Sequence, residues 1–163
     1  MTDERLGEGL WGALTRLPRG SGVVFRHYAT PAKERRALFR RVMRIARARD
    51  LVVVRAGDWA GPGEDGAHNQ RGPRLMTAAA HDRREAVAAL RRGAHVLFVS
   101  PVFATRSHPG AVVLGPRAAQ RVAQGMPVVT IALGGMDARR FRGLAGFDGW
   151  AGIDAWLGGS GAK

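Results

Sequence analysis

Two patterns of apolar residues alternate along this chain. In the first, apolar residues follow one another without a polar position, as from Val96 to Val99, which predicts a strand buried on both faces. Comparable short segments predict further strands near residues 23, 51, 67, 75, 128 and 150. In the second pattern, apolar residues recur at helical spacing, which predicts helices over residues 6–17, 31–49, 82–92 and 116–124.

The alternation of strands with helices predicts an α/β fold in which right-handed crossovers join parallel strands. Seven strands are one fewer than a TIM-type (β/α)8 barrel needs, and Met1-Thr2 stands where the first strand would end. We therefore expect a barrel over residues 1–157 that is incomplete at its first strand, followed by a flexible tail over residues 158–163. An open, doubly wound sheet is the alternative.

Local signals predict where several helices begin. Thr30 is expected to cap the helix that starts at Pro31, and Asp82 and Asp137 are expected to cap two later helices. Residues 70–75 leave little room for a helix between two predicted strands. The barrel is therefore also expected to lack its fourth helix.

Composition narrows the class of protein. A length of 163 residues fits one domain, and the lack of cysteine excludes disulfides and thiolate metal sites. No apolar run approaches the roughly 20 residues that a membrane-spanning helix needs, and no signal peptide opens the chain. We expect a cytoplasmic protein.

The net charge of +13 raises the question of nucleic-acid binding. Apart from Lys33 and Lys163, the 26 basic residues are arginines. They are spread over most of the chain and aromatic residues are scarce, so nucleic acid is not a favoured partner. The arginines of the helix over residues 31–49 are expected to form a solvated outer face. A homo-oligomer is left open.

Reactive groups gather in the loop after Val96–Val99. Thr105, Ser107 and His108 can bind anions or transfer protons, and the carboxyl ends of parallel strands are where α/β barrels place their chemistry. Gly134-Gly135 ends another predicted strand, where backbone N–H groups can approach a phosphate; a tight turn is the alternative there.

Five segments in order resemble the thiamine phosphate synthase and thiazole tautomerase family, a phosphate-binding (β/α)8 barrel. The most specific, residues 100–109, is similar to the family's Gly-Pro-Val-Phe-Pro-Thr-x-Thr-Lys-Pro loop. Residues 128–136 are similar to its Val-Val-Ala-Ile-Gly-Gly-Ile strand. Residues 65–68 resemble Asp-Gly-Val-His, residues 79–81 resemble Ser-Val-His, and residues 149–155 resemble the family's last strand.

The resemblance implies roles for individual residues. His81 corresponds to the histidine that transfers protons in the tautomerase branch. Arg26 is retained on the side that binds pyrophosphate, and Arg55 stands where the family has a magnesium-binding aspartate. The residues implied in phosphate and thiazole binding are Thr105, Ser107, His108, Gly134, Gly135, Ile153 and Asp154.

Magnesium, which the family uses, is not expected here, because carboxylates are missing at the positions of its ligands. The parent reaction joins hydroxymethylpyrimidine pyrophosphate to a thiazole phosphate. We expect a divergent member that binds a small phosphorylated, thiazole phosphate-like ligand in thiamine biosynthesis. The alternatives are a metal-free thiazole phosphate tautomerase, a non-catalytic phosphate-ligand binder, and a basic protein that binds nucleic acid.

Overall fold

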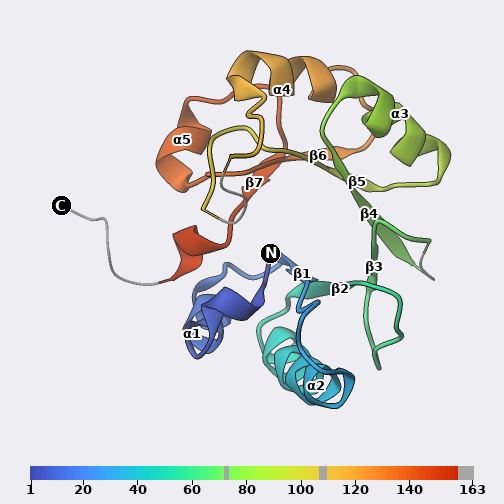
Figure 1. The fold of residues 1–163 in the computed structure, drawn as a ribbon, viewed down its shortest axis with the longest axis vertical. Helices are drawn as coiled ribbons and strands as arrows, with labels where there is room; N and C mark the ends of the chain where they lie inside the picture. The colour runs from blue at the N-terminus through green and yellow to red at the C-terminus, as the bar shows by residue number, and fades with distance from the viewer. Residues whose placement is uncertain (72–73, 107–109, 158–163) are drawn as a thin grey trace. The chain divides into compact units, whose positions relative to one another are not determined.

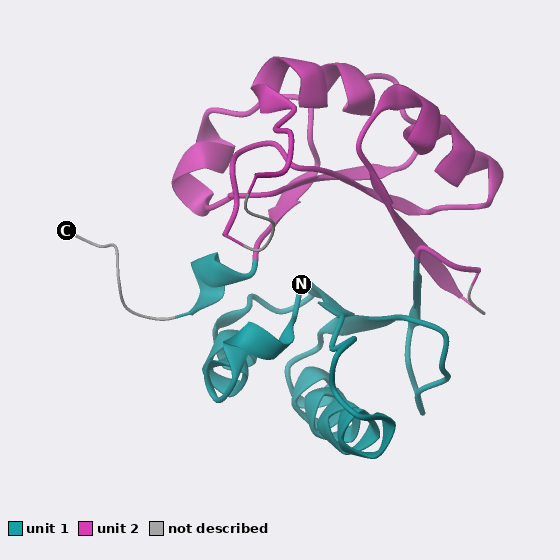
Figure 2. Cartoon of the chain, viewed as in Figure 1, with its two compact units in different colours: residues 1–68, 153–163 teal, residues 69–152 magenta. Residues whose placement is uncertain are grey.

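The computed structural model describes residues 1–71, 74–106 and 110–157. The chain divides into two compact units (Figure 2). Unit 1 consists of Met1–His68 together with Ile153–Lys163, and unit 2 consists of Asn69–Gly152.

Unit 1 contains three parallel strands and the helices that pack on them. Its strands are β1 (Gly22–Phe25), β2 (Val52–Ala56) and β3 (Gly66–His68), paired in chain order. Its helices are η1 (Glu4–Leu6), α1 (Gly9–Arg16), α2 (Ala32–Ala48) and η2 (Asp154–Trp156). In Figure 1, α1 and α2 lie on the same side of β1 and β2.

An aromatic cluster fills the core of unit 1. Phe25 and Phe39 are fully buried and meet edge to face, with ring centroids 5.2 Å apart. Trp59 meets both rings edge to face, and His27 stacks on Phe25 at 4.6 Å. Such pairs add about 0.5–1.5 kcal/mol each beyond the area that they bury, so the cluster holds α2 firmly against β1.

Unit 2 has four parallel strands in chain order, with helices on one side. The strands are β4 (Leu75–Ala80), β5 (Val96–Val99), β6 (Val129–Leu133) and β7 (Gly149–Ala151). The helices are α3 (Arg83–Arg91), α4 (Gly115–Ala123) and α5 (Ala138–Arg142). Figure 1 shows all three helices on the same side of these strands, where small side chains such as Ala86, Ala89 and Ala119 are fully buried.

The predicted alternation of strands and helices is confirmed, and the fold is α/β with parallel strands. Asp82 and Asp137 cap α3 and α5 as expected, each accepting a hydrogen bond from a backbone N–H three residues on. The cap predicted at Thr30 is wrong. Pro31 is the N-cap of α2, and the Thr30 hydroxyl donates instead to Glu4 at 3.3 Å.

Two features bear on the expected incompleteness of the barrel. The Thr2 N–H donates to the Val24 carbonyl oxygen at 2.9 Å, so the first residues lie alongside β1. Among residues 69–71 and 74, which lie between β3 and β4, the structure has no helix. Both agree with the expectation, while the count of barrel strands stays a prediction.

In the described ranges, no helix is long and apolar enough to cross a membrane.

One arrangement recurs at the start of three strand pairs. Asp148, which precedes β7, accepts the Thr130 N–H through its carboxylate at 2.7 Å and donates its own N–H to the Thr130 carbonyl oxygen at 2.9 Å. Asp65, before β3, does the same with Val53 of β2. His95, before β5, uses Nδ1 and its N–H in the same way with Met76 of β4.

We call this arrangement the strand clamp. In each case a residue just before one strand holds both backbone groups of the second residue of the preceding strand. The clamp satisfies polar groups that would otherwise be left without a partner where a strand begins. It also fixes the register of the pair, so that the carboxyl ends of neighbouring strands reach the same level.

We predict that Asp148→Ala lowers the free energy of unfolding by about 1–3 kcal/mol, because the N–H of the buried Thr130 loses its carboxylate acceptor. Asp148→Asn should cost less, since an amide oxygen can still accept that bond. Urea denaturation of the wild type and the two variants measures the difference. Equal loss in both variants would show that the bond to Thr130 is not what the carboxylate contributes.

Candidate functional site

The carboxyl edge of unit 2 brings several predicted site residues to one level. Ala80 pairs with Val99, and Val99 pairs with Ala132, so the three strands end side by side. His81 therefore follows β4 next to the point where the loop after β5 begins. The Ser100 N–H donates to the Ala80 carbonyl oxygen at 3.1 Å, which continues this alignment beyond the strands.

The loop after β5, residues 101–114, is anchored at its base. The N–H groups of Val102 and Phe103 donate to the carbonyl oxygens of Leu133 and Gly134, at 2.8 and 3.1 Å. The Leu114 N–H returns to the Pro101 carbonyl oxygen at 3.0 Å and closes the loop. The two ends of the loop are thus held against the end of β6 and against each other.

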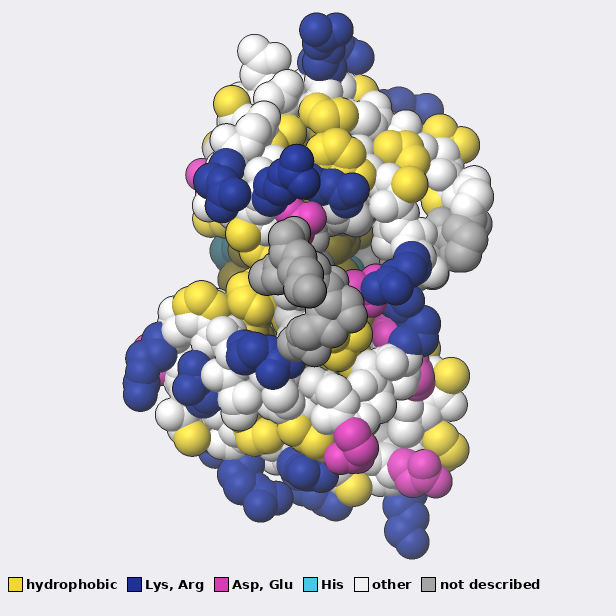
Figure 3. All heavy atoms as spheres, turned by 90° about the vertical axis from the view of Figure 1, so that its left-hand side faces the viewer, with side chains coloured by type: hydrophobic (Ala, Val, Ile, Leu, Met, Phe, Trp, Pro, Cys, Tyr) yellow, Lys and Arg dark blue, Asp and Glu magenta, His cyan; other side chains and the backbone are white. Residues whose placement is uncertain are grey.

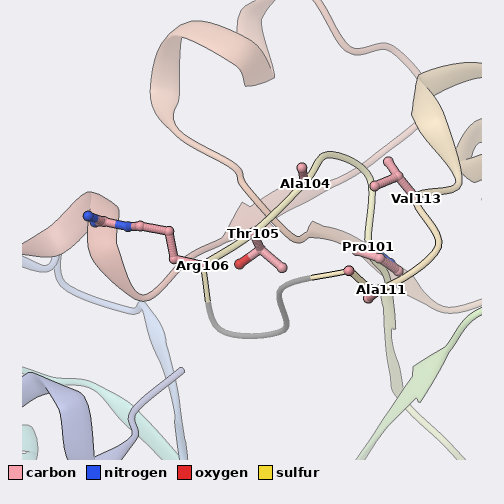
Figure 4. Close-up of a pocket in the computed structure, with 7 residues that line it drawn as sticks. Pro101, Ala104, Thr105, Arg106, Ala111 and Val113 are labelled. Atoms are coloured by element: carbon pink, nitrogen blue, oxygen red, sulfur yellow. The ribbon is translucent and has the colours of Figure 1, made fainter.

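A pocket of about 400 Å³ lies within this loop (Figure 4). Its walls are mainly apolar, and its lining residues are Pro101, Ala104, Thr105, Arg106, Gly110, Ala111 and Val113. In Figure 4 the Thr105 side chain lies between the two limbs of the loop, whereas the Arg106 side chain extends away from the other labelled residues. A volume of this size suits a small ligand, and a single hydroxyl among apolar walls can orient it.

Two other predicted members of this loop, Ser107 and His108, lie outside the described residues. Their roles stay predictions.

Gly134 and Gly135 have a structural reason to be glycine. Their φ angles are +97° and +58°, which favour glycine. A Cβ on Gly134 would lie 2.7 Å from Cα of Pro101, and one on Gly135 would collide with the Ala104 carbonyl oxygen. The pair therefore lets the loop after β5 pack on the end of β6; phosphate binding by its N–H groups stays a prediction.

Arg140 is a cation beside this turn that the sequence did not single out. Its Nη1 donates to the Gly135 carbonyl oxygen, and its guanidinium lies over the Phe103 ring at 5.0 Å from the centroid. In the sequence, only its position five residues after Gly135 indicated that Arg140 could lie near the glycine pair. A positive charge held here favours an anion near the loop after β5.

His81 has a partner that sequence reasoning also missed. Its Nδ1 lies 2.8 Å from Oε2 of Glu85, which also accepts the His81 backbone N–H at 2.7 Å. These bonds hold the pKa of Glu85 below its ordinary value, so the carboxylate stays ionised and accepts a hydrogen bond from Nδ1–H. Nε2 is then the nitrogen left to exchange a proton. The spacing of four residues across the start of a helix was the available signal.

In unit 1, Arg26 follows β1 and Arg55 lies in β2, beside Phe25. The Arg26 guanidinium contacts the sulfur of Met1 at 3.5 Å and lies 5.9 Å from the centroid of the Tyr28 ring. The two arginines thus come from neighbouring strands.

Arg55 is engaged within the protein. Its Nε donates to Oε1 of Glu64 at 2.8 Å, and its Nη1 donates to the Gly57 carbonyl oxygen at 2.7 Å. Both side chains of the ion pair are largely buried, at 11% and 9% exposure. A phosphate would have to compete with Glu64 for this guanidinium.

The acidic groups around Arg55 do not fit magnesium. The second oxygen of Glu64 accepts the Gly61 N–H at 2.9 Å, and Asp65 is occupied by its strand clamp. Magnesium needs carboxylate or phosphate oxygens in a near-octahedral array. Within residues 1–71, 74–106 and 110–157, no cluster of three or more candidate ligands could hold a metal ion.

The last two predicted residues, Ile153 and Asp154, belong to unit 1, where Asp154 begins η2. The pKa of the nearby Arg5 is raised, mainly by its hydrogen bond to Asp3 and to a smaller extent by the charge of Asp154. The Asp154 carboxylate is thus near a cation of its own unit.

The comparisons with known proteins identify a family and a fold. The model of the thiamine monophosphate synthase family matches residues 65–156, which is more than half of the chain. A solved structure of thiamine phosphate pyrophosphorylase from Pyrococcus furiosus is similar with a TM-score of 0.80 and 21% sequence identity, covering 96% of this chain and 85% of that chain. At this identity the likeness concerns the fold. No curated protein gives a significant match.

Two buried histidines of unit 1 make stability depend on pH. Burial, followed by the charges of Arg26 and of the chain's amino group, lowers the pKa of His68 from 6.5 to about 4. Burial also lowers the pKa of His27. Between pH 6.5 and about 4 the unfolded chain therefore binds protons at His68 that the folded chain does not. Folding stability is lost as pH falls through this window.

We predict that His68 alone accounts for a loss of up to about 3 kcal/mol between pH 6.5 and 4. In His68→Gln this part of the loss should vanish, although the variant starts from a lower stability at pH 7. Urea denaturation across this pH range measures the change, with His81→Gln, at an exposed position, as the control. If the stability of His68→Gln fell with pH as steeply as that of the wild type, the assignment of this loss to His68 would be wrong.

Proposed function

We propose, on the premise that the chain belongs to the thiamine monophosphate synthase family, that it acts in thiamine biosynthesis by binding a thiazole phosphate-like ligand. The pocket within the loop after β5 is the observation that carries this proposal. Its position, at the carboxyl edge of parallel strands, is where α/β proteins bind their ligands.

The chemistry of the pocket suits such a ligand. The apolar side chains of Pro101, Ala111 and Val113 can cover an aromatic thiazole ring, and the Thr105 hydroxyl can donate to a phosphate oxygen. The Arg140 guanidinium, held beside Gly135, adds a favourable potential for the phosphate. Apolar walls with few polar groups bind a small ring in one orientation.

Binding is proposed to need no magnesium. In the parent reaction a divalent ion would stabilise the departing pyrophosphate. In this chain Arg55 stands at the position of one metal-binding carboxylate and forms an ion pair with Glu64. A fixed guanidinium can pair with phosphate oxygens but does not supply the same compact charge. Coupling of the pyrimidine pyrophosphate to a thiazole phosphate is therefore expected to be very slow and indifferent to EDTA.

We predict that thiazole phosphate binds the wild-type chain equally well with magnesium and with EDTA in isothermal titration calorimetry. Thr105→Val should weaken binding about 5- to 10-fold, because one hydrogen bond to a charged group is lost and little volume changes. Thr15→Val, at an exposed threonine of α1, is the matched control and should leave affinity unchanged. Gly135→Val is unsuitable, because its side chain would displace the loop.

Robust magnesium-dependent synthesis of thiamine phosphate by the wild type would contradict the metal-free proposal. Unchanged affinity in Thr105→Val would place the phosphate away from the pocket.

A second candidate function, isomerisation of a thiazole phosphate, is favoured by the pairing of His81 with Glu85. Glu85 fixes the proton on Nδ1, so that Nε2 can take a proton from one position of the ligand and return it at another. The ligand keeps its composition, and no further reactant is needed. Proton transfer by a positioned histidine contributes roughly 100- to 10,000-fold in rate.

For this candidate we predict that the chain catalyses exchange of ligand protons with D2O, followed by NMR. His81→Gln should abolish the exchange. Glu85→Gln should slow it about 10- to 100-fold, because the imidazole loses the partner that orients it. Affinity measured by calorimetry should stay constant in both variants. Exchange at the wild-type rate in His81→Gln would leave ligand binding as the function.

A further inference from the structure

The outer face of α2 carries an unusual row of charges. Five cationic side chains follow one another at intervals of three or four residues and are all exposed: Lys33, Arg36, Arg40, Arg44 and Arg47. At 3.6 residues per turn these positions form one stripe along the helix. We call it the α2 stripe.

Among the residues that the structure describes, no acidic side chain pairs with the α2 stripe. Within residues 1–71, 74–106 and 110–157, none of its five side chains forms an ion pair or a side-chain hydrogen bond. Glu34 is the only acid in α2, and it lies about 100° round the helix from Lys33. The sequence predicts a solvated outer face of arginines here, and the structure adds that these five cations have no ion-pair partner in the described ranges.

The opposite face of α2 fixes the stripe in place. Phe39, Val42 and Ala46 are fully buried in the core of unit 1, so the helix cannot rotate its cations inward. Like charges four residues apart, such as Arg36 with Arg40 and Arg40 with Arg44, cost the free protein part of its helix stability. A partner with regularly spaced negative charges would remove this repulsion.

We propose that the α2 stripe binds the phosphate backbone of a double-stranded nucleic acid without reading its sequence. From Lys33 to Arg47 the stripe is about 21 Å long at 1.5 Å per residue. A duplex carries a phosphate charge about every 1.7 Å of its axis, so such a length faces about a dozen phosphates. Arginine is well suited to the contact, because its planar guanidinium donates two parallel bonds to one phosphate.

The side chains of the stripe distinguish this partner from others. The stripe has no aromatic residue on which unpaired bases could stack, which single-strand binding requires. A helix that binds an anionic membrane inserts its apolar face into the lipid, but the apolar face of α2 is the core around Phe39 and Val42.

Overall basicity is the competing explanation. In Figure 3, Lys and Arg side chains are widely distributed over the face shown and outnumber Asp and Glu side chains. A test must therefore separate the α2 stripe from the net charge. Arg117 and Arg121 of α4 provide a matched control, because they are exposed and four residues apart, as Arg40 and Arg44 are.

The experiment measures binding of the full chain to a fluorescent 25-base-pair DNA and to the corresponding RNA duplex by anisotropy, from 50 to 200 mM KCl. The variants are Arg40→Glu/Arg44→Glu and Arg117→Glu/Arg121→Glu, which change the net charge equally. Five phosphate contacts predict a slope of log K against log salt near about −4.5, or about a 500-fold loss over this range. Thermal melts check that both variants fold.

We expect Arg40→Glu/Arg44→Glu to lose at least about tenfold in affinity at 100 mM KCl and to reduce the slope by about 2. The α4 variant should lose less than about threefold, and changes of duplex sequence should have no effect. Equal losses in the two variants would overturn the proposal in favour of net charge. No duplex binding at 50 mM KCl, or binding only to single strands or to anionic phosphatidylserine vesicles, would overturn it as well.

Discussion

The strand clamp is the interaction on which the geometry of this protein depends. A parallel strand pair has no hairpin to set its register, so something else must decide which residues stand opposite. Here Asp65, His95 and Asp148 each hold a backbone N–H and a carbonyl oxygen of the preceding strand. A slip by one residue would break these bonds and turn every side chain to the other face of the sheet.

The consequences appear at the opposite edge. Because β4 and β5 are in a fixed register, His81 and the loop after β5 begin at the same level. The pairing of β5 with β6 places Gly134 against Pro101, at a distance that only glycine allows. The pocket within the loop is therefore a product of strand register and of two glycines that permit close packing.

Much of the fold could be predicted from the sequence because its signals are local. A continuous apolar run identifies β5 with the bounds that the structure shows, and Asp82 and Asp137 act as caps through their own side chains. The cap predicted at Thr30 is wrong, because its hydroxyl donates a hydrogen bond to Glu4 instead. Glu4 is far away in the sequence, and a local pattern contains no information about it.

The candidate site was harder to predict for the same reason. The ion pair of Arg55 with Glu64 joins β2 to the loop that precedes β3, and the contact of Arg140 with Gly135 depends on how α5 follows the turn. A sequence shows that these residues exist but not that their charges meet. Glu85 could have been found from its spacing to His81 alone, since both lie at the start of α3.

The two units differ in the groups that they hold at the carboxyl ends of their strands. In unit 2 the loop after β5 lines a pocket of about 400 Å³. In unit 1 the charges at the strand ends bind to one another, so that Arg55 satisfies Glu64. Strand ends of the same parallel architecture can thus offer different charges to a ligand.

The most direct test is a crystal structure of the chain grown with thiazole phosphate and magnesium. We predict that the ligand lies between the limbs of the loop after β5, with its phosphate within hydrogen-bond distance of the Thr105 hydroxyl and no magnesium ion beside Arg55. A ligand seated elsewhere, or a magnesium ion held by Glu64 in unit 1, would contradict this account of the site.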